Sequence, residues 1–281
     1  MIDTLYVNGC SWTEGHLLHN DPPARIYAES IGYSFPNPKD LFFANKNGIG
    51  PEYPFRDIYD KFNFAGVIAK QLNINTVHND AIGAGSNARI IRTTVDYVKN
   101  LTKEQCSNTL IIIGWTDPSR NELYLNDNKE QQYWAKFNLT QPFRYLNGDF
   151  DPEFTANIDK FQEMYTVYVH SYYANIVKFF EQSYLLANLL ENKGIRYYFF
   201  NTFPVFWGLR EPEYTNTITQ FNREIEIYHT LNTHSIHDTF VHYIGHKPEW
   251  TLPDDIHHPN ILGHYLWAEQ LLHSIQTRGI I

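Results

Sequence analysis

Short continuous apolar runs recur along the chain, and each predicts a buried strand. The strongest run covers residues 110–113, Leu-Ile-Ile-Ile. A run that is apolar at every position predicts a strand covered on both faces, as in a parallel sheet with helices on either side. Weaker runs predict further strands at residues 5–7, 74–78, 196–200 and 239–243.

Stretches with helical spacing of apolar residues fill the intervals between these strands. They cover residues 62–72, 86–98, 151–192, 217–231 and 259–279. The third stretch is too long for one globular helix, so we expect a break near residues 170–173. We expect the last helix to begin at Pro259, because proline suits a first helical position, and to end by Gly279.

The alternation of strands and helices predicts an α/β fold. We expect a doubly wound, flavodoxin-like parallel sheet of about five strands with helices on both faces. Two ring-rich stretches without sustained periodicity, at about 12–55 and 115–150, are predicted to be irregular insertions. The chain has no internal repeat, and a length of 281 residues suits one α/β domain spanning residues 1–281.

Polar, glycine-containing blocks follow the first three predicted strands, and a fourth polar block precedes the last helix. They are Gly-Cys-Ser-Trp-Thr at 9–13, Gly-Ala-Gly-Ser-Asn at 83–87, Gly-Trp-Thr-Asp at 114–117 and Asp-Ile-His-His-Pro-Asn at 255–260. Parallel sheets bind ligands beyond the carboxyl ends of their strands. A serine hydroxyl becomes a nucleophile when an imidazole accepts its proton and a carboxylate orients that imidazole. Ser11, His258 and Asp255 supply this set of groups.

In content and order, these four blocks resemble the SGNH, or GDSL-type, hydrolase family. The resemblance spans nearly the whole chain, although only the four short blocks carry it. It implies an SGNH hydrolase-like fold with Ser11 as the nucleophile and Asp255 and His258 as its partners. It also implies that the N–H groups of Ser11 and Gly85 donate to the oxyanion, where one donor typically contributes about 3 kcal/mol.

The resemblance leaves several positions of the site open. The Gly-Ala-Gly sequence makes the register uncertain by one residue, so Ala84 is an alternative donor to Gly85. Thr116 stands where the family usually has Asn, and its hydroxyl is a shorter donor than an amide. Asn87 from the second block and Arg120 after the third block complete the candidate oxyanion and substrate-binding set.

Arg120 has two interpretations. A guanidinium suits a carboxylate or phosphate on a substrate. The alternative is a structural ion pair with Asp117 or Glu122. The surrounding Trp-Thr-Asp-Pro-Ser-Arg sequence at 115–120 is similar to a variant found in phage-encoded members of the family, so the resemblance does not identify a substrate.

Other chemistries find weaker support. Cys10 is an alternative nucleophile if its thiol pKa is depressed, although a cysteine beside a strand is more often a small packing residue. Residues 83–88 match the dinucleotide fingerprint G-x-G-x-x-G/A, but no acidic residue ends the next strand, so no nucleotide cofactor is expected. The 13 histidines show no compact ligand spacing, so no metal is predicted, while His16 and His19 are candidates for a pocket wall.

The amino-acid composition excludes several classes of partner and site. The 22 basic and 31 acidic side chains give a net charge of −9, which disfavours nucleic acid. The two cysteines cannot build a disulfide framework or a four-thiolate zinc site. The chain starts without a basic and apolar leader, and its longest apolar run, 110–115, is too short to cross a bilayer. We therefore expect a cytoplasmic protein with no membrane partner, and the sequence carries no signal for an oligomeric state.

These observations favour a serine hydrolase of the SGNH type. The expected substrate is an acyl ester, with O-acetyl or O-acyl carbohydrate as the favoured class because aromatic rings stack on sugars. Transfer of the acyl group to an acceptor other than water would use the same residues. The alternative is a non-catalytic binding or structural protein on the same fold, which the Thr116 departure favours.

Overall fold

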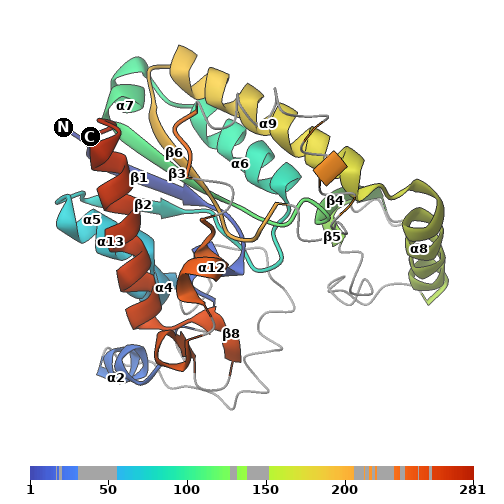
Figure 1. The fold of residues 1–281 in the computed structure, drawn as a ribbon, viewed down its shortest axis with the longest axis horizontal. Coiled ribbons are helices and arrows are strands. Elements are labelled where there is room, and N and C mark those ends of the chain that lie inside the picture. Colours follow the sequence, from blue (N-terminus) through green and yellow to red (C-terminus); the bar gives the residue numbers. More distant parts are fainter. Residues whose placement is uncertain are drawn as a thin grey trace.

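Four parallel strands form the central sheet in the computed structural model of the chain (Figure 1). They are β1 (Thr4–Asn8), β2 (Thr76–Asn79), β3 (Thr109–Trp115) and β6 (Arg196–Asn201), in the order β2-β1-β3-β6. All three neighbouring pairs are parallel. This arrangement confirms the predicted doubly wound parallel sheet.

The structure describes most of the chain. The described residues are 1–16, 18, 21–30, 56–126, 132–137, 152–205, 212, 215–216, 219, 231–234, 238–245, 247–252 and 255–281. The predicted helix at 217–231 lies almost entirely outside these residues.

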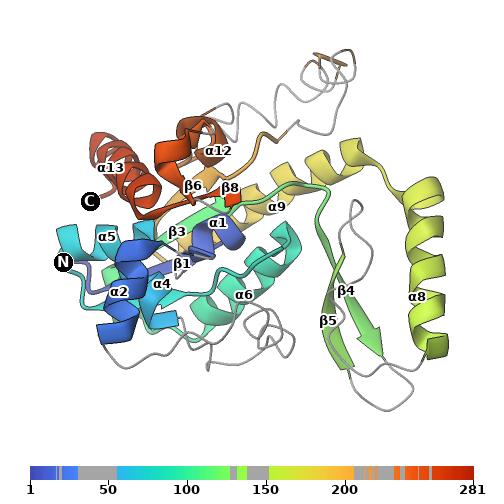
Figure 2. The same cartoon turned by 90° about the horizontal axis from the view of Figure 1, so that it is seen from below.

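Helices cover both faces of the sheet, as Figures 1 and 2 show. On one face, α5 (Phe64–Gln71), α12 (Phe240–Ile244) and α13 (Ile261–Thr277) pack on strand residues such as Val7 and Ile112. On the other face, α6 (Asn87–Lys99) and α9 (Tyr172–Asn192) pack on Ile111 and Phe199. Every residue of β3 is buried, which explains why this strand is apolar throughout its length.

The remaining elements are short or lie outside the central sheet. They are α1 (Ser11–Glu14), α2 (Pro22–Ser30), α4 (Arg56–Phe62), α7 (Lys103–Asn108), β4 (Asn121–Asn126), β5 (Gln132–Phe137), α8 (Pro152–Met164), a π-helical turn (Tyr165–Val169), a 3₁₀ turn (Pro248–Trp250), β7 (Thr251–Leu252) and β8 (Asp255–Pro259). None of the helices described here is long and apolar enough to cross a membrane.

The predicted fifth strand at 239–243 is wrong. Thr239 caps the N-terminus of α12, and its side chain accepts a hydrogen bond from the His242 N–H. The position beside β6 is instead held by one parallel bridge between Phe199 and Thr233. β-branched and aromatic residues made the segment resemble a strand, but the threonine cap and a left-handed Gly245 define a short helix.

The two insertions contain more regular structure than predicted. β4 and β5 form an antiparallel hairpin within 115–150, and Figure 2 shows this hairpin and α8 standing apart from the sheet. Within 12–55, α1 and α2 are helical, while residues 31–55 lie outside the described part. The four-residue α1 is too short for a clear period, and the hairpin lies outside the central sheet, so the pattern did not indicate them.

Two helix boundaries illustrate the role of caps. The predicted break near 170–173 is confirmed, because the π-helical turn ends at Val169 and Ser171 caps α9. The predicted start of the last helix at Pro259 is wrong by two residues. Pro259 ends β8, and the Asn260 side chain caps α13 by accepting from the Gly263 N–H. The helix stops before Gly279, whose φ is +65°, as expected.

Candidate active site

The turn after β1 carries Ser11 on the first residue of α1. Asn8 fixes this turn, since its Oδ1 accepts from the Gly9 N–H (2.9 Å) and its Nδ2 donates to Ile90 O (3.1 Å) and Thr93 Oγ1 (2.7 Å) on α6. Gly9 is required because a Cβ there would collide with the Thr13 side chain and lie 2.8 Å from a backbone oxygen. Ser11 is therefore held in a fixed position at the carboxyl end of β1.

The segment before α13 brings His258 to Ser11 from the other end of the sequence. The Nε2 of His258 lies 3.1 Å from the Ser11 Oγ, and both residues are half-buried. This distance is within the range over which an imidazole can accept a hydroxyl proton. The loop that holds His258 is anchored just beyond it, where the Asp21 Oδ2 accepts from the Ile261 N–H (2.7 Å).

Asp255 lies on β8 with His258, three residues earlier in the chain. Its side chain is outside the described part of the structure, so the contact between Asp255 and His258 stays a prediction.

A second imidazole borders the same serine. The rings of His16 and His258 are 5.5 Å apart, and the His16 Nδ1 lies 3.8 Å from the Glu14 Oε2. Glu14 is only 4% exposed. A Cβ built on Gly83 would lie 3.9 Å from the Ser11 Cβ and 3.6 Å from the Glu14 Oε2. The polar block at 83–87 therefore packs against Ser11 and Glu14. His16 was predicted to be part of a pocket wall, whereas Glu14 was not predicted, and its only signal in the sequence is its position three residues after Ser11.

The candidate oxyanion donors differ in their availability. The Gly85 N–H donates to Ile82 O at 2.9 Å, so this group is already engaged. Ala84, the alternative in the predicted register, has a left-handed φ of +56°. Among the described residues, neither the Ser11 N–H nor the Ala84 N–H donates a hydrogen bond. The geometry therefore favours Ala84 over Gly85 as the second donor.

The third block is held by Asn87. The Thr116 N–H donates to the Asn87 Oδ1 (2.9 Å), and the Asn87 Nδ2 donates to Thr116 O (3.1 Å). Both ends of the Asn87 amide are thus engaged in holding the backbone of this turn. The Thr116 Oγ1 is buried and has no hydrogen-bond partner in the described structure. A buried hydroxyl without a partner among the described residues is unusual in a folded protein.

Two further residues beside Ser11 have clear positions. Cys10 is fully buried in the apolar core beside Ser11, which suits a packing residue. Trp12 is 5% exposed and packs edge to face on Phe240, so it does not offer a stacking surface for a sugar. The side chains of Tyr133 and Trp134 lie outside the described part. No group of metal-ligating side chains occurs among the described residues.

A fully buried histidine lies one turn into α13. The His264 Nδ1 accepts from the Phe64 N–H (3.4 Å), and its ring faces Phe240 edge to face. Burial, with a smaller contribution from the charge of His258, lowers the pKa of His264 to about 3. His264 is therefore a neutral packing group beneath the site.

The chain matches one family model and is similar to several solved structures. A family model described as a family of unknown function, DUF6071, matches residues 49–280. Comparison with curated proteins gives no match. Similar solved structures include a psychrotrophic esterase from Pseudoalteromonas sp., at 10% identity and a TM-score of 0.45 over 98% of this chain and 97% of that one.

Two other solved structures give slightly lower TM-scores. The lipase Lip_vut3 from a goat rumen metagenome is 11% identical with a TM-score of 0.43, covering 98% of this chain and 97% of that one. An acetyl-xylooligosaccharide esterase from Geobacillus is 14% identical with a TM-score of 0.40, covering 97% of this chain and 94% of that one. At such TM-scores the arguments about function come from the residues of this chain.

Proposed function

The chain belongs to DUF6071, a family of unknown function, and we propose that it is a serine esterase of the SGNH type that cleaves or transfers an acyl ester. The observation that carries the proposal is the 3.1 Å hydrogen bond between the Ser11 Oγ and the His258 Nε2. These residues are 247 positions apart in the sequence and meet at the carboxyl edge of the sheet.

The proposed reaction follows from this contact. The Ser11 Oγ attacks the acyl carbon while its proton passes to the His258 Nε2. The ester C–O bond breaks, and the same imidazole returns the proton to the leaving alkoxide. Water, or an acceptor hydroxyl, then attacks the acyl carbon while its proton passes to the His258 Nε2. The bond between the acyl carbon and the Ser11 Oγ breaks, and the imidazole returns the proton to the serine oxygen. The Ser11 and Ala84 N–H groups donate to the oxyanion, and Asp255 orients the imidazole.

The proposed substrate class rests on fewer observations than the proposed reaction does. O-acetyl or O-acyl carbohydrate remains the proposed class because the hairpin segment is rich in aromatic residues, which stack on sugar faces. The burial of Trp12 removes one of the rings on which this choice was based.

A second candidate is a non-catalytic binding protein on the same fold. It is favoured because the Gly85 and Thr116 N–H groups already donate hydrogen bonds within the protein. The N–H groups of Ser11 and Ala84 are then the two backbone donors left for an oxyanion. If the wild-type protein is inert towards esters, Thr116→Asn tests this candidate. Hydrolysis gained by that variant means that only one donor was missing, whereas continued inertness supports a binding role.

The proposal is tested by ester turnover of three variants. Ser11→Ala should lower kcat/KM for p-nitrophenyl acetate at least about a thousandfold, because only oxyanion and binding contributions remain. His258→Gln should lose turnover similarly, and the wild-type rate should rise with pH over the range in which an imidazole loses its proton.

Cys10→Ala is the matched control beside the nucleophile. It should keep most of the turnover, because Cys10 is a buried packing residue. Loss of activity in Cys10→Ala with activity retained in Ser11→Ala, each folded by circular dichroism, contradicts the nucleophile assignment.

A further inference from the structure

Arg120 is held in a rigid turn at the end of β3. Its N–H donates to Asp117 O (3.1 Å), and the Asp117 Oδ1 accepts from the Ser119 N–H (2.7 Å). Asn121 closes the turn by donating from Nδ2 to Ser119 O (3.1 Å). The backbone therefore presents the Arg120 side chain from a fixed base at the carboxyl edge of the sheet.

The acidic groups expected to neutralise Arg120 are engaged elsewhere. Glu122 binds Arg92 through two hydrogen bonds, Nη2 to Oε1 (2.6 Å) and Nε to Oε2 (3.0 Å). The Asp117 Oδ1 accepts from the Ser119 backbone and from the Tyr172 hydroxyl (3.5 Å). Among the described residues Arg120 has no ion pair, and its Nη1 is buried without a hydrogen-bond partner. The structural ion pair considered from the sequence is therefore not formed.

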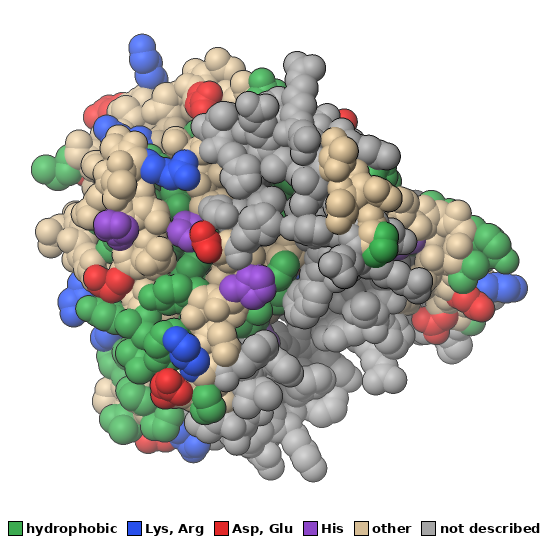
Figure 3. Space-filling model, viewed as in Figure 1, with side chains coloured by type: hydrophobic (Ala, Val, Ile, Leu, Met, Phe, Trp, Pro, Cys, Tyr) green, Lys and Arg blue, Asp and Glu red, His purple; other side chains and the backbone are tan. Residues whose placement is uncertain are grey.

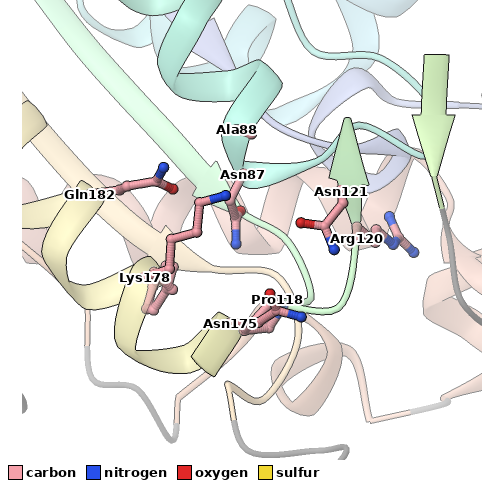
Figure 4. A pocket seen from close by; sticks show the side chains of 9 residues that line it. Asn87, Ala88, Pro118, Arg120, Asn121, Asn175, Lys178 and Gln182 are labelled. Atoms are coloured by element: carbon pink, nitrogen blue, oxygen red, sulfur yellow. The ribbon is translucent and has the colours of Figure 1, made fainter. Parts of the chain in front are cut away.

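A half-buried charge without a counter-ion lowers the stability of the folded protein, so the position of the Arg120 guanidinium points to a role in binding. Figure 4 shows the pocket beside this turn, where Lys178 reaches from α9 towards Asn87 while the Arg120 guanidinium points away from both. The guanidinium lies 5.0 Å from the centroid of the Phe203 ring, which follows β6. Arg120 thus forms part of the pocket wall but directs its charge elsewhere.

A row of aromatic rings connects this charge to the proposed nucleophile. Phe203 meets Trp12 edge to face at 5.9 Å, and the Trp12 ring lies 6.0 Å from the His258 ring. Trp12 directly follows Ser11. The Arg120 guanidinium and the Ser11 hydroxyl therefore border the same edge of the sheet, with apolar rings between them.

On these observations, and resting on the proposed esterase function, we propose that Arg120 binds an anionic group of the substrate, so that the preferred substrate is an acyl ester that also carries a carboxylate or a phosphate. A planar guanidinium pairs with either group through two charge-assisted hydrogen bonds. The half-buried Phe203 ring beside the guanidinium suits a short apolar stretch of the substrate between its ester and its charge.

The test compares charged and neutral esters of equal length. The charged substrates are the p-nitrophenyl half-esters of succinate and glutarate, and the neutral ones are p-nitrophenyl butyrate and pentanoate. Wild-type kcat/KM should favour the charged esters. In Arg120→Met the ratio of charged to neutral kcat/KM should fall about tenfold to a hundredfold, the factor expected for charge-assisted hydrogen bonds. Arg120→Lys should restore part of the ratio, because it keeps the charge without the planar fork.

Arg25→Met is the matched control, since Arg25 is an exposed arginine on α2 paired with Glu29. It should leave both the turnover and the ratio unchanged. Inhibition by succinate and by inorganic phosphate distinguishes the two anions, and the stronger inhibitor identifies the group. A ratio that is the same in the wild type and Arg120→Met overturns the proposal.

Failure of the esterase proposal is distinguishable from failure of the anion site. If the wild type hydrolyses none of the four esters, the esterase proposal has failed, and the anion site is decided by thermal unfolding with succinate or phosphate added. A rise in Tm for the wild type and Arg25→Met, but not for Arg120→Met, supports the site. Equal behaviour of all three proteins overturns it.

Discussion

At the residue scale, the surroundings of Ser11 and His258 depend on side chains that have no sequence motif of their own. Glu14 becomes notable only because the fold buries it beside His16, and Asp21 because α2 and α13 meet at its side chain. Neither of these two contacts follows from the local pattern of apolar and polar residues.

The neutral state of His264 gives a prediction about acid stability. An exposed histidine in the unfolded chain takes up a proton near pH 6.5, whereas the folded His264 has a pKa of about 3. The unfolded state therefore binds more protons between these values, and stability falls as the pH falls through this range. His264→Gln should remove this part of the pH dependence, up to about 1.4 kcal/mol per pH unit.

Urea unfolding from pH 7 to pH 4 measures this effect. His273→Gln is the control, because His273 is an exposed histidine on the same helix. The slope of the free energy of unfolding against pH should be smaller in His264→Gln than in the wild type and unchanged in His273→Gln. Parallel curves for all three proteins would mean that folding does not lower the pKa of His264.

At the element scale, the long helices and the strands of the central sheet were predicted well, whereas the hairpin and α12 were not. The helices α6, α9 and α13 have enough residues for their period to be clear. The hairpin of β4 and β5 was predicted to be irregular, and α12 was predicted to be a strand. The hairpin forms a sheet of its own, outside the alternation of strands and helices that predicted the central sheet, and α12 has only five residues. Caps and neighbouring strands decide such short segments.

The attachment of the hairpin gives the element-scale prediction. Arg92 on α6 holds Glu122 on β4, and the Glu122 side chain is only 4% exposed. Arg92→Met should lower the free energy of unfolding by about 3–5 kcal/mol, because it leaves a buried carboxylate without its partner. Arg25→Met breaks a pair whose side chains are 59% and 53% exposed, and it should cost less than about 1 kcal/mol.

Urea unfolding of these two variants checks the comparison. The double variant Arg92→Met with Glu122→Gln should recover part of the loss, because no buried charge is then left alone. An Arg92→Met protein as stable as Arg25→Met contradicts this role for the pair.

At the scale of the whole molecule, topology explains the site. Residues near both ends of the chain meet because β1 is central in the sheet and α13 packs beside α5 on the same face. The sequence could predict this meeting through the rule that parallel strands present their carboxyl ends at one edge. On the face shown in Figure 3, basic and acidic side chains are interspersed rather than gathered into one basic field.

The most direct test of the account is covalent labelling by a fluorophosphonate probe, followed by peptide mapping. An activated Ser11 should be phosphonylated, and intact mass should rise by one probe group per chain. Ser11→Ala and the heat-unfolded wild type should take up none, His258→Gln should react far more slowly, and Cys10→Ala should react as the wild type does. An unchanged mass for the folded wild type after prolonged exposure, or a label on a residue other than Ser11, would contradict the assignment of Ser11 as a nucleophile activated by His258.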